Sequence, residues 1–327
     1  MKCEYLGTMR NKECPSISIV VPVYNEGDSI PIFLDAMSLE LSDIDNDIEI
    51  LFVDDGSSDS TLKNILQTIP VCEFANIRCV SLSRNFGKEA AVSAGLNQAV
   101  GDVVIPMDVD LQDPPSLIKE FLIKWADGYD VIYGLRVSRS TDGVAKKVTS
   151  NWFYKLFNRV SPVKIPENAG DFRLMDRRVV DVVNQLPERT RFMKGLFAWV
   201  GFRTCSVPFD RIERASGNSK WSYWKLWNFA LDGITSFSTI PLRVWTYIGS
   251  LLALGAFLYM LFIVFLAIFF DIDAPGYASI MTIMLFLGGI QLITLGIIGE
   301  YIGRLFIESK KRPIYIVDQI YDSNNVD

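Results

Sequence analysis

Two aspartates separated by one residue, Asp108 and Asp110, follow an apolar segment at residues 103–107. If that segment is a strand, side-chain alternation points both carboxylates to one side. Two carboxylates aimed at one place repel each other unless a cation lies between them. A divalent cation would also neutralise a departing diphosphate. We therefore interpret Asp108, Asp110 and Gln112 as a metal and diphosphate site, while Asp113 fits a helix N-cap before two prolines.

Three earlier segments carry groups suited to a nucleotide. The run Val53–Ser57 contains Asp54, whose carboxylate can accept hydrogen bonds from imide N–H groups and sugar hydroxyls. Tyr24 can stack on a base and Glu26 can accept from a ribose hydroxyl. Lys88 follows a glycine at a helix start, where a phosphate is favoured. Ordinary turns and helix caps remain the alternative at each place.

Later basic and acidic residues extend this set. Arg136, Arg139, Arg214 and Lys220 can bind a phosphate presented at a bilayer surface, since cationic side chains form charge-assisted hydrogen bonds. A basic flank attracted to anionic lipid is the alternative. Asp171 has the chemistry of a base, although a single aspartate is more often structural.

The composition excludes several chemistries. The 327 residues include no histidine, which excludes histidine-dependent triads and histidine-ligated zinc. A metal must therefore be held mainly by oxygen ligands, which favours Mg²⁺ or Mn²⁺. The net charge of -6 argues against a nucleic-acid partner. Five cysteines without a CxxC pair predict free thiols in a reducing compartment, and the polar residues 1–15 do not resemble a signal peptide.

Alternating apolar strands and helical patterns must position these groups. The expected strands are 17–23, 48–53, 77–82, 103–107 and 131–135, and the expected helices are 30–41, 61–69, 88–99 and 115–127. This alternation predicts an α/β domain with a mostly parallel sheet. Ligands bind at the carboxyl ends of the strands in such sheets, and the polar motifs fall at those ends.

Two C-terminal segments lack charged residues, 244–270 and 274–299. Each is longer than the roughly 20 apolar residues that span a bilayer, so we predict a transmembrane hairpin. The connecting loop lacks Lys and Arg whereas the outer flanks are basic, which predicts that both termini are cytoplasmic. Residues 221–243 are rich in aromatic side chains and predict an amphipathic interfacial helix. Small-residue pairs such as Gly299 and Gly303 suit packing within the hairpin or between subunits.

Taken together, the motifs resemble family 2 glycosyltransferases with the GT-A fold. They are VPVYNE (21–26), VDDGSSD (53–59), SRNFGKEAA (83–91), MDVDLQDPP (107–115), GDFRLM (170–175) and GNSKW (217–221). The resemblance is strongest to polyprenyl-phosphate glycosyltransferases, including dolichyl-phosphate mannose synthases and bactoprenol glucosyltransferases. It covers nearly the whole chain. It implies a polar extension (1–15), a GT-A domain (16–220), an interfacial region (221–243), two spans (244–270 and 274–299) and a cytoplasmic tail (300–327).

The resemblance also implies roles for particular residues. For the donor, it implies a nucleoside pocket at Pro22, Tyr24, Glu26 and Asp54, and a nucleotide contact at Lys88. It implies a metal and diphosphate motif at Asp108, Asp110 and Gln112, and a catalytic base at Asp171. It also implies acceptor-phosphate arginines at Arg136 and Arg139, and phosphate contacts at Arg214, Ser219 and Lys220. The QxxRW signature of processive synthases is absent from the chain, which argues against polymerisation.

The implied reaction is the transfer of one hexose, with glucose from UDP-glucose favoured, to undecaprenyl phosphate with inversion. The phosphate acceptor has a second pKa of about 6 and hardly needs deprotonation, so we expect Asp171 to orient a substrate or a basic residue. Mannose, N-acetylglucosamine or aminoarabinose donors remain alternatives. A silent nucleotide-sugar-binding scaffold that recruits a flippase is disfavoured by the intact pair Asp108 and Asp110. A channel subunit is disfavoured because few polar residues lie in the spans. A homo-oligomer and a flippase partner stay open.

Overall fold

The computed structural model describes residues 14–44, 46–137, 155, 157–159, 161–166, 169–210, 233, 235–270 and 276–323. An eight-stranded sheet forms the centre, in the order β7-β5-β6-β4-β1-β2-β3-β8. Its strands are β1 (Ile17–Val23), β2 (Ile48–Asp54), β3 (Asn76–Leu82), β4 (Val103–Pro106), β5 (Val131–Arg136), β6 (Ala169–Asp176), β7 (Thr204–Phe209) and β8 (Val317–Tyr321). The central pairs β1–β2, β1–β4 and β2–β3 are parallel, whereas β6 and β8 run antiparallel to their neighbours.

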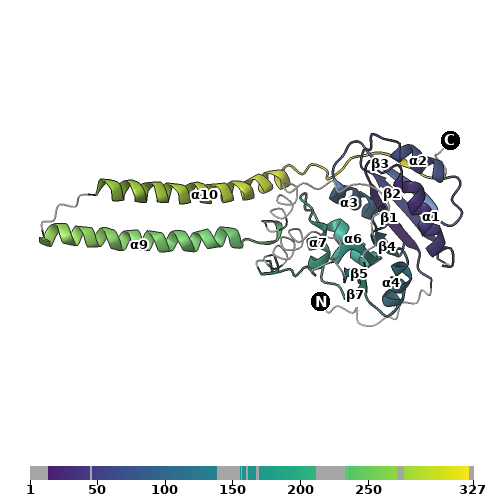
Figure 1. The fold of residues 1–327 in the computed structure, drawn as a ribbon, viewed down its shortest axis with the longest axis horizontal. Helices are drawn as coiled ribbons and strands as arrows, with labels where there is room; N and C mark the ends of the chain where they lie inside the picture. The colour runs from purple at the N-terminus through teal and green to yellow at the C-terminus, as the bar shows by residue number, and fades with distance from the viewer. Residues whose placement is uncertain are drawn as a thin grey trace.

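Helices cover both faces of this sheet (Figure 1). One face carries α1 (Ser29–Leu41), α2 (Thr61–Thr68) and α4 (Leu117–Ala126), and the other carries α3 (Lys88–Gln98), α6 (Arg177–Gln185) and α7 (Met193–Trp199). Burial on both faces explains why every residue of β2 is buried and why β1 is almost entirely apolar. The result is the α/β GT-A architecture that the motifs imply, with a mostly parallel central sheet.

Helix α3 packs unusually close to the sheet because its inner face consists of small residues. A Cβ placed on Gly95 would overlap Val20 Cγ1 of β1, so a larger residue there would force the helix or the sheet to shift. Because α3 follows the carboxyl end of β3, its N-terminus, with Lys88, lies at the carboxyl edge of the sheet.

The five predicted strands and four predicted helices are all present. We expected the alternation of side chains along a strand to point Asp108 and Asp110 to one side. That expectation was wrong, because β4 ends at Pro106 and both aspartates follow it. Leu111 has a φ of 54°, which ends the extended backbone. Val109 is nonetheless buried between two half-buried aspartates, so the alternation of burial persists beyond the strand.

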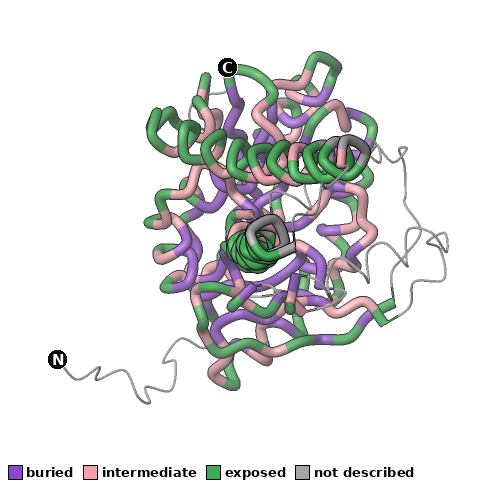
Figure 2. Tube along the Cα trace, turned by 90° about the vertical axis from the view of Figure 1, so that its left-hand side faces the viewer, coloured by how far each residue is buried: buried purple, intermediate pink, exposed green. Residues whose placement is uncertain are grey.

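Two long helices project from the same side of the domain, α9 (Ile240–Phe270) and α10 (Tyr277–Ser309) (Figure 1). Segments Leu242–Ile263 and Thr282–Ser309 are long and apolar enough to cross a membrane, and they are not buried within the chain. Figure 2 shows this contrast between the exposed hairpin and the buried sheet. Both helices exceed the predicted spans. Among the described residues outside the local backbone of α10, no atom lies within 4 Å of a Cβ built on Gly299 or Gly303, so these glycines make no close packing with that part of the chain.

The segment after the hairpin returns to the sheet. Within residues 300–327, which we predicted as a cytoplasmic tail, α10 continues to Ser309 and β8 pairs antiparallel with β3. Glu308 Oε1 accepts hydrogen bonds from the backbone amides of Arg189 (2.7 Å) and Thr190 (3.2 Å). The second long helix is therefore tied to the α/β domain at its base. Most of the predicted interfacial region 221–243, and the hairpin loop, lie outside the described residues.

Candidate active site

The carboxyl edge of the sheet gathers polar residues from segments far apart in sequence. Strands β1, β2, β4 and β5 end here, and β6 begins here because it runs antiparallel to both of its neighbours. The start of β6 therefore brings Asp171 to the loops that carry the nucleotide-like motifs.

Asp55 connects two of these loops. Its carboxylate accepts hydrogen bonds from the backbone amides of Phe86 (2.7 Å) and Gly87 (2.9 Å). Gly56 follows with a φ of 66°, and a Cβ there would lie 2.5 Å from the carbonyl carbon of Arg84. Burial raises the pKa of Asp55, and the two amide bonds oppose that rise. Asp55 thus fixes the segment that leads into Lys88, a positioning role that we did not assign from the sequence.

Lys88 lies between two carboxylates. Its Nζ is 2.7 Å from Asp108 Oδ1 and 2.8 Å from Asp171 Oδ2. Burial alone would lower the pKa of Lys88, but the two carboxylates outweigh it and the pKa rises. Burial would likewise raise the pKa of Asp171, but the charges of Lys88 and Lys194 hold it well below its usual range. Lys88 is therefore a cation and Asp171 a carboxylate across the ordinary pH range.

The predicted metal residues form a partial ligand set. Asp108 and Asp110 are both half-buried, and Asp110 Oδ1 accepts a hydrogen bond from the backbone amide of Gln112 at 3.3 Å. Within the described residues, no three acidic, cysteine or histidine side chains form a complete metal cage. Two carboxylates fit a cation such as Mg²⁺, which is commonly held by one or two carboxylates together with substrate phosphates. The residues present therefore fit a metal that is shared with a diphosphate.

The predicted nucleoside residues lie along the ends of β1 and β2. The ring of Tyr24 is 39% exposed and is open to stacking. The Glu26 carboxylate accepts a hydrogen bond from Ser29 Oγ (3.2 Å), and Pro22 is half-buried in β1. Asp54 is only 1% exposed and accepts from the Ser57 amide at 3.1 Å, so it also supports the turn after β2.

Arg136 lies at the end of β5. Its Nη2 is 3.2 Å from the buried Asp113 Oδ1 and 3.1 Å from a Cβ built on Gly170. It therefore lies beside the residue that precedes Asp171. The other predicted basic-loop residues, Arg139, Arg214, Ser219 and Lys220, lie outside the described residues, so their roles stay predictions.

Three charged residues around Asp171 were not predicted, namely Glu89, Arg173 and Lys194. Arg173 donates to the carbonyl oxygens of Gly170 (2.8 Å) and Asp171 (3.4 Å). Burial, together with the charge of Asp171, raises the pKa of Glu89 to about 7. Arg173 lies in the quoted GDFRLM motif and could have been chosen. Nothing in the sequence distinguishes Lys194 or Glu89 from solvated helix charges.

Comparison with known proteins gives the class of this chain. Residues 18–183 match the model of glycosyl transferase family 2, and residues 240–305 match the GtrB C-terminal hairpin. The chain belongs to glycosyl transferase family 2 and is a glycosyltransferase with a C-terminal membrane anchor.

Its relatives match over both parts. The chain is 52% identical over 307 residues to an uncharacterized glycosyltransferase of Synechocystis, covering 93% of this chain and 95% of that protein. It is 49% identical to a prophage bactoprenol glucosyl transferase homolog of Escherichia coli, covering 93% and 99%. It is 50% identical to the bactoprenol glucosyl transferase of Shigella phage SfV, covering 92% and 97%.

Solved structures match more distantly. A glucosyl-3-phosphoglycerate synthase from Mycobacterium tuberculosis, solved with Mn²⁺, UDP-glucose and phosphoglyceric acid, is 21% identical with a TM-score of 0.45, covering 68% of this chain and 78% of that one. The family assignment therefore rests on the family model and the sequence relatives.

Proposed function

We propose that this enzyme transfers one glucosyl residue from UDP-glucose to a polyprenyl phosphate, undecaprenyl phosphate in a bacterium, with inversion at the anomeric carbon. A bond forms between an acceptor phosphate oxygen and the anomeric carbon, and the bond from that carbon to the diphosphate breaks. The products are a sugar linked to the lipid phosphate and free UDP. The similarity to bactoprenol glucosyl transferases, over the catalytic domain and the hairpin alike, supports this acceptor and this sugar.

The single observation that carries the proposal is the position of Lys88. One ammonium group lies within 2.8 Å of carboxylates from two separate motifs, Asp108 and Asp171. A cation at this point is suited to stabilise a departing diphosphate, because preorganised charges act strongly where charge develops. Its two partners can hold it there before substrate binds.

The remaining residues would divide the work between the two substrates. Tyr24, Glu26 and Asp54 would hold the nucleoside, and Pro22 would shape the wall beside it. Asp108 and Asp110, with Gln112, would hold Mg²⁺ or Mn²⁺, which supplies charge neutralisation to the departing diphosphate when bound. Arg136 and, in the segments not described, Arg139, Arg214, Ser219 and Lys220 would contact phosphates.

Asp171 would orient the site rather than remove a proton. Its pKa is held well below the usual range by Lys88 and Lys194, so it is a weak base. The acceptor phosphate, with a second pKa of about 6, is largely dianionic at neutral pH and needs no strong base. An ion-paired aspartate that keeps Lys88 in place fits this requirement.

Anchoring has a direct rationale. A polyprenyl tail stays in the bilayer, so a hairpin tied to the domain raises the effective concentration of the acceptor phosphate at the site. The basic flanks at Arg243 and at Lys310 to Arg312, beside a hairpin loop without Lys or Arg, support a cytoplasmic catalytic domain.

The test is product formation in detergent from undecaprenyl phosphate and a panel of labelled UDP- and GDP-sugars, with Mg²⁺, Mn²⁺ or EDTA. We expect lipid-linked label from UDP-glucose, lost with EDTA and with Asp110→Ala. Label from a mannose, N-acetylglucosamine or aminoarabinose donor would keep the reaction and replace the sugar. Nucleotide binding without label from any donor would replace the proposal with a recruiting scaffold.

A further inference from the structure

A cavity of about 180 Å³ lies between α7 and the strands β5, β6 and β7. Ala169 and Arg173 of β6 line it, and Asp171 lies between them at the alternate position that shares their face of the strand. The charged side chains that line the cavity are Lys164, Arg173 and Lys194, and no acidic side chain among the described residues lines it. The cavity is therefore cationic and adjoins the proposed reaction centre.

One of the three cations is held by its own contacts. The Arg173 guanidinium donates to the Gly170 carbonyl and lies 4.2 Å from the centre of the Phe197 ring. Lys194, near the start of α7, lines the same cavity. Cations gathered at one cavity favour an anion, and a phosphate can accept several charge-assisted hydrogen bonds from them.

Most of the remaining residues that line the cavity are apolar. Ile165 and Ala198 line the cavity and also pack in an aromatic cluster with Phe192 and Phe237. The rings of Phe192 and Phe237 lie 6.1 Å apart, and α9 begins three residues after Phe237, at Ile240. This buried cluster therefore links the lining of the cavity to the residues that precede the first long helix.

The volume limits what can enter. Pockets for drug-sized ligands occupy about 300–1,000 Å³, so this cavity is too small for a nucleotide sugar. A phosphate with a short hydrocarbon segment is a better match, because cationic and apolar side chains both line the cavity.

We propose that this cavity binds the phosphate of the polyprenyl acceptor and the isoprene unit beside it, with Lys194 as the main phosphate contact. The proposal rests on the proposed function, since it names the place where that acceptor enters. It places the acceptor phosphate on the side of β6 that faces α7. Arg136, which we had assigned to that phosphate from the sequence, lies against Gly170 and already pairs with the buried Asp113. Arg173 is a positioning residue that holds the backbone of Gly170 and Asp171.

The test compares Lys194→Met and Lys194→Arg with the exposed control Lys119→Met of α4, all in the full-length enzyme in detergent. We expect Lys194→Met to raise the KM for undecaprenyl phosphate about tenfold or more, the effect of losing one charge-assisted hydrogen bond. The KM for the sugar donor should stay within about twofold, since a contact made only to the acceptor leaves donor binding unchanged. Lys194→Arg should recover most of the acceptor affinity. An unchanged acceptor KM, or a raised donor KM instead, would overturn the proposal.

Calorimetric titration can compare a prenyl phosphate with inorganic phosphate as ligands of the cavity, and it requires no catalytic activity. Geranyl phosphate should bind the wild type more tightly than inorganic phosphate, and Lys194→Met should weaken it, while UDP binds both proteins equally. Equal affinity for geranyl phosphate and inorganic phosphate would remove the isoprene from the proposal. If the wild type made no product from any polyprenyl phosphate, the proposed function would fail, and this titration would still decide whether the cavity binds a prenyl phosphate.

Discussion

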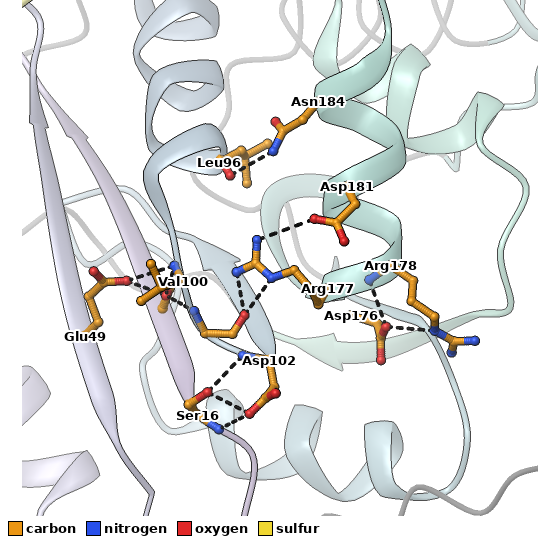
Figure 3. A network of polar contacts seen from close by, with 12 residues as sticks. Ser16, Glu49, Leu96, Val100, Asp102, Asp176, Arg177, Arg178, Asp181 and Asn184 are labelled. Atoms are coloured by element: carbon orange, nitrogen blue, oxygen red, sulfur yellow. Dashed lines mark hydrogen bonds and ion pairs between the residues drawn. The ribbon is translucent and has the colours of Figure 1, made fainter.

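The two edges of the central sheet both carry dense polar networks, yet they are built differently. At the amino edge, Ser16 donates through its amide (2.8 Å) and its hydroxyl (2.6 Å) to Asp102. The buried Glu49 accepts from Ser18 Oγ (2.5 Å) and pairs with Arg78 (2.5 Å). Figure 3 shows the contacts of Ser16, Glu49 and Asp102 in this network, where backbone amides of residues 100–102, between α3 and β4, supply several of the donors.

At the carboxyl edge, the side chains are more open and share their partners. Lys88 holds two carboxylates at once, and the side chains of Lys88, Asp108 and Asp171 are 37%, 36% and 31% exposed. The side chain of Glu49 at the other edge is only 7% exposed. A carboxylate fixed by backbone amides stabilises the fold, whereas an exposed carboxylate that shares a lysine can exchange that partner for a substrate. Substitutions at the carboxyl edge should therefore lower activity, whereas substitutions at the amino edge should lower stability.

The largest effect is expected for Asp110→Ala at the carboxyl edge. Loss of one of two carboxylates suited to a divalent cation should lower kcat about 10³-fold, the scale at which electrostatic stabilisation of a transition state acts. Initial rates of labelled product formation measure this change, and a thermal melt should stay near the wild type because Asp110 is half-buried in a turn. A kcat within tenfold of the wild type would remove Asp110 from the proposed metal site.

Lys88→Met should have the next largest effect, a loss of about 10²-fold in kcat. The substitution leaves Asp108 and Asp171 without their shared cation, so the pKa of Asp171 should rise toward its ordinary value. Relative to the wild type at the same pH, activity should then fall further as the pH is lowered toward 4, because protonation of the acceptor phosphate affects both proteins equally. The exposed Lys63→Met on α2 is the matched control and should leave both kcat and the pH profile unchanged.

Asp171→Asn should lower kcat only about tenfold if this residue orients Lys88, because an amide oxygen can still accept one hydrogen bond. The rate should be measured at pH 7, where the acceptor is largely ionised. A loss of several orders of magnitude would show that the reaction needs a base at this position.

The sequence predicted much of this edge but not its key contact. Apolar segments that end in polar motifs identified the strands β1, β2 and β4 and the residues that follow them. The Lys88–Asp171 contact spans 83 residues and exists because β6 inserts antiparallel between β4 and β5. No local pattern encodes that insertion. The return of β8 to β3 after the hairpin is likewise a long-range pairing.

Glu89→Gln should have a smaller effect, confined to the pH dependence. The pKa of Glu89 is raised from 4.5 to about 7 by burial and by Asp171, against the opposing charges of Lys88 and Lys194. The folded state therefore binds this proton more tightly than the unfolded state. The stabilisation is complete below pH 4.5 and is lost as the pH rises through about 7.

Across this window the melting temperature of the wild type should fall relative to that of Glu89→Gln. Ionised Glu89 adds a negative charge beside Asp171, so at pH 8 the variant should show kcat/KM for the acceptor about threefold above the wild type. Because wild type and Glu89→Gln are compared at the same pH, protonation of the acceptor phosphate affects both equally. The exposed Glu120→Gln of α4 serves as the control, and parallel profiles for wild type and Glu89→Gln would contradict the prediction.

The smallest effect on turnover is expected at the amino edge, for Glu49→Gln. Removing this buried charge leaves Arg78 without its counter-ion, which should cost about 3 kcal/mol of the free energy of unfolding. A thermal melt in detergent should register that loss as a lower midpoint, while kcat per folded molecule stays at the wild-type value because Glu49 lies at the far end of β2 from Asp54. A fall in kcat without a fall in the melting temperature would mean that the amino edge takes part in catalysis. In that case the strands would transmit the effect of a charge change at the amino edge to the reacting residues at the carboxyl edge. The assignment of stability to one edge and of reaction to the other would then be wrong.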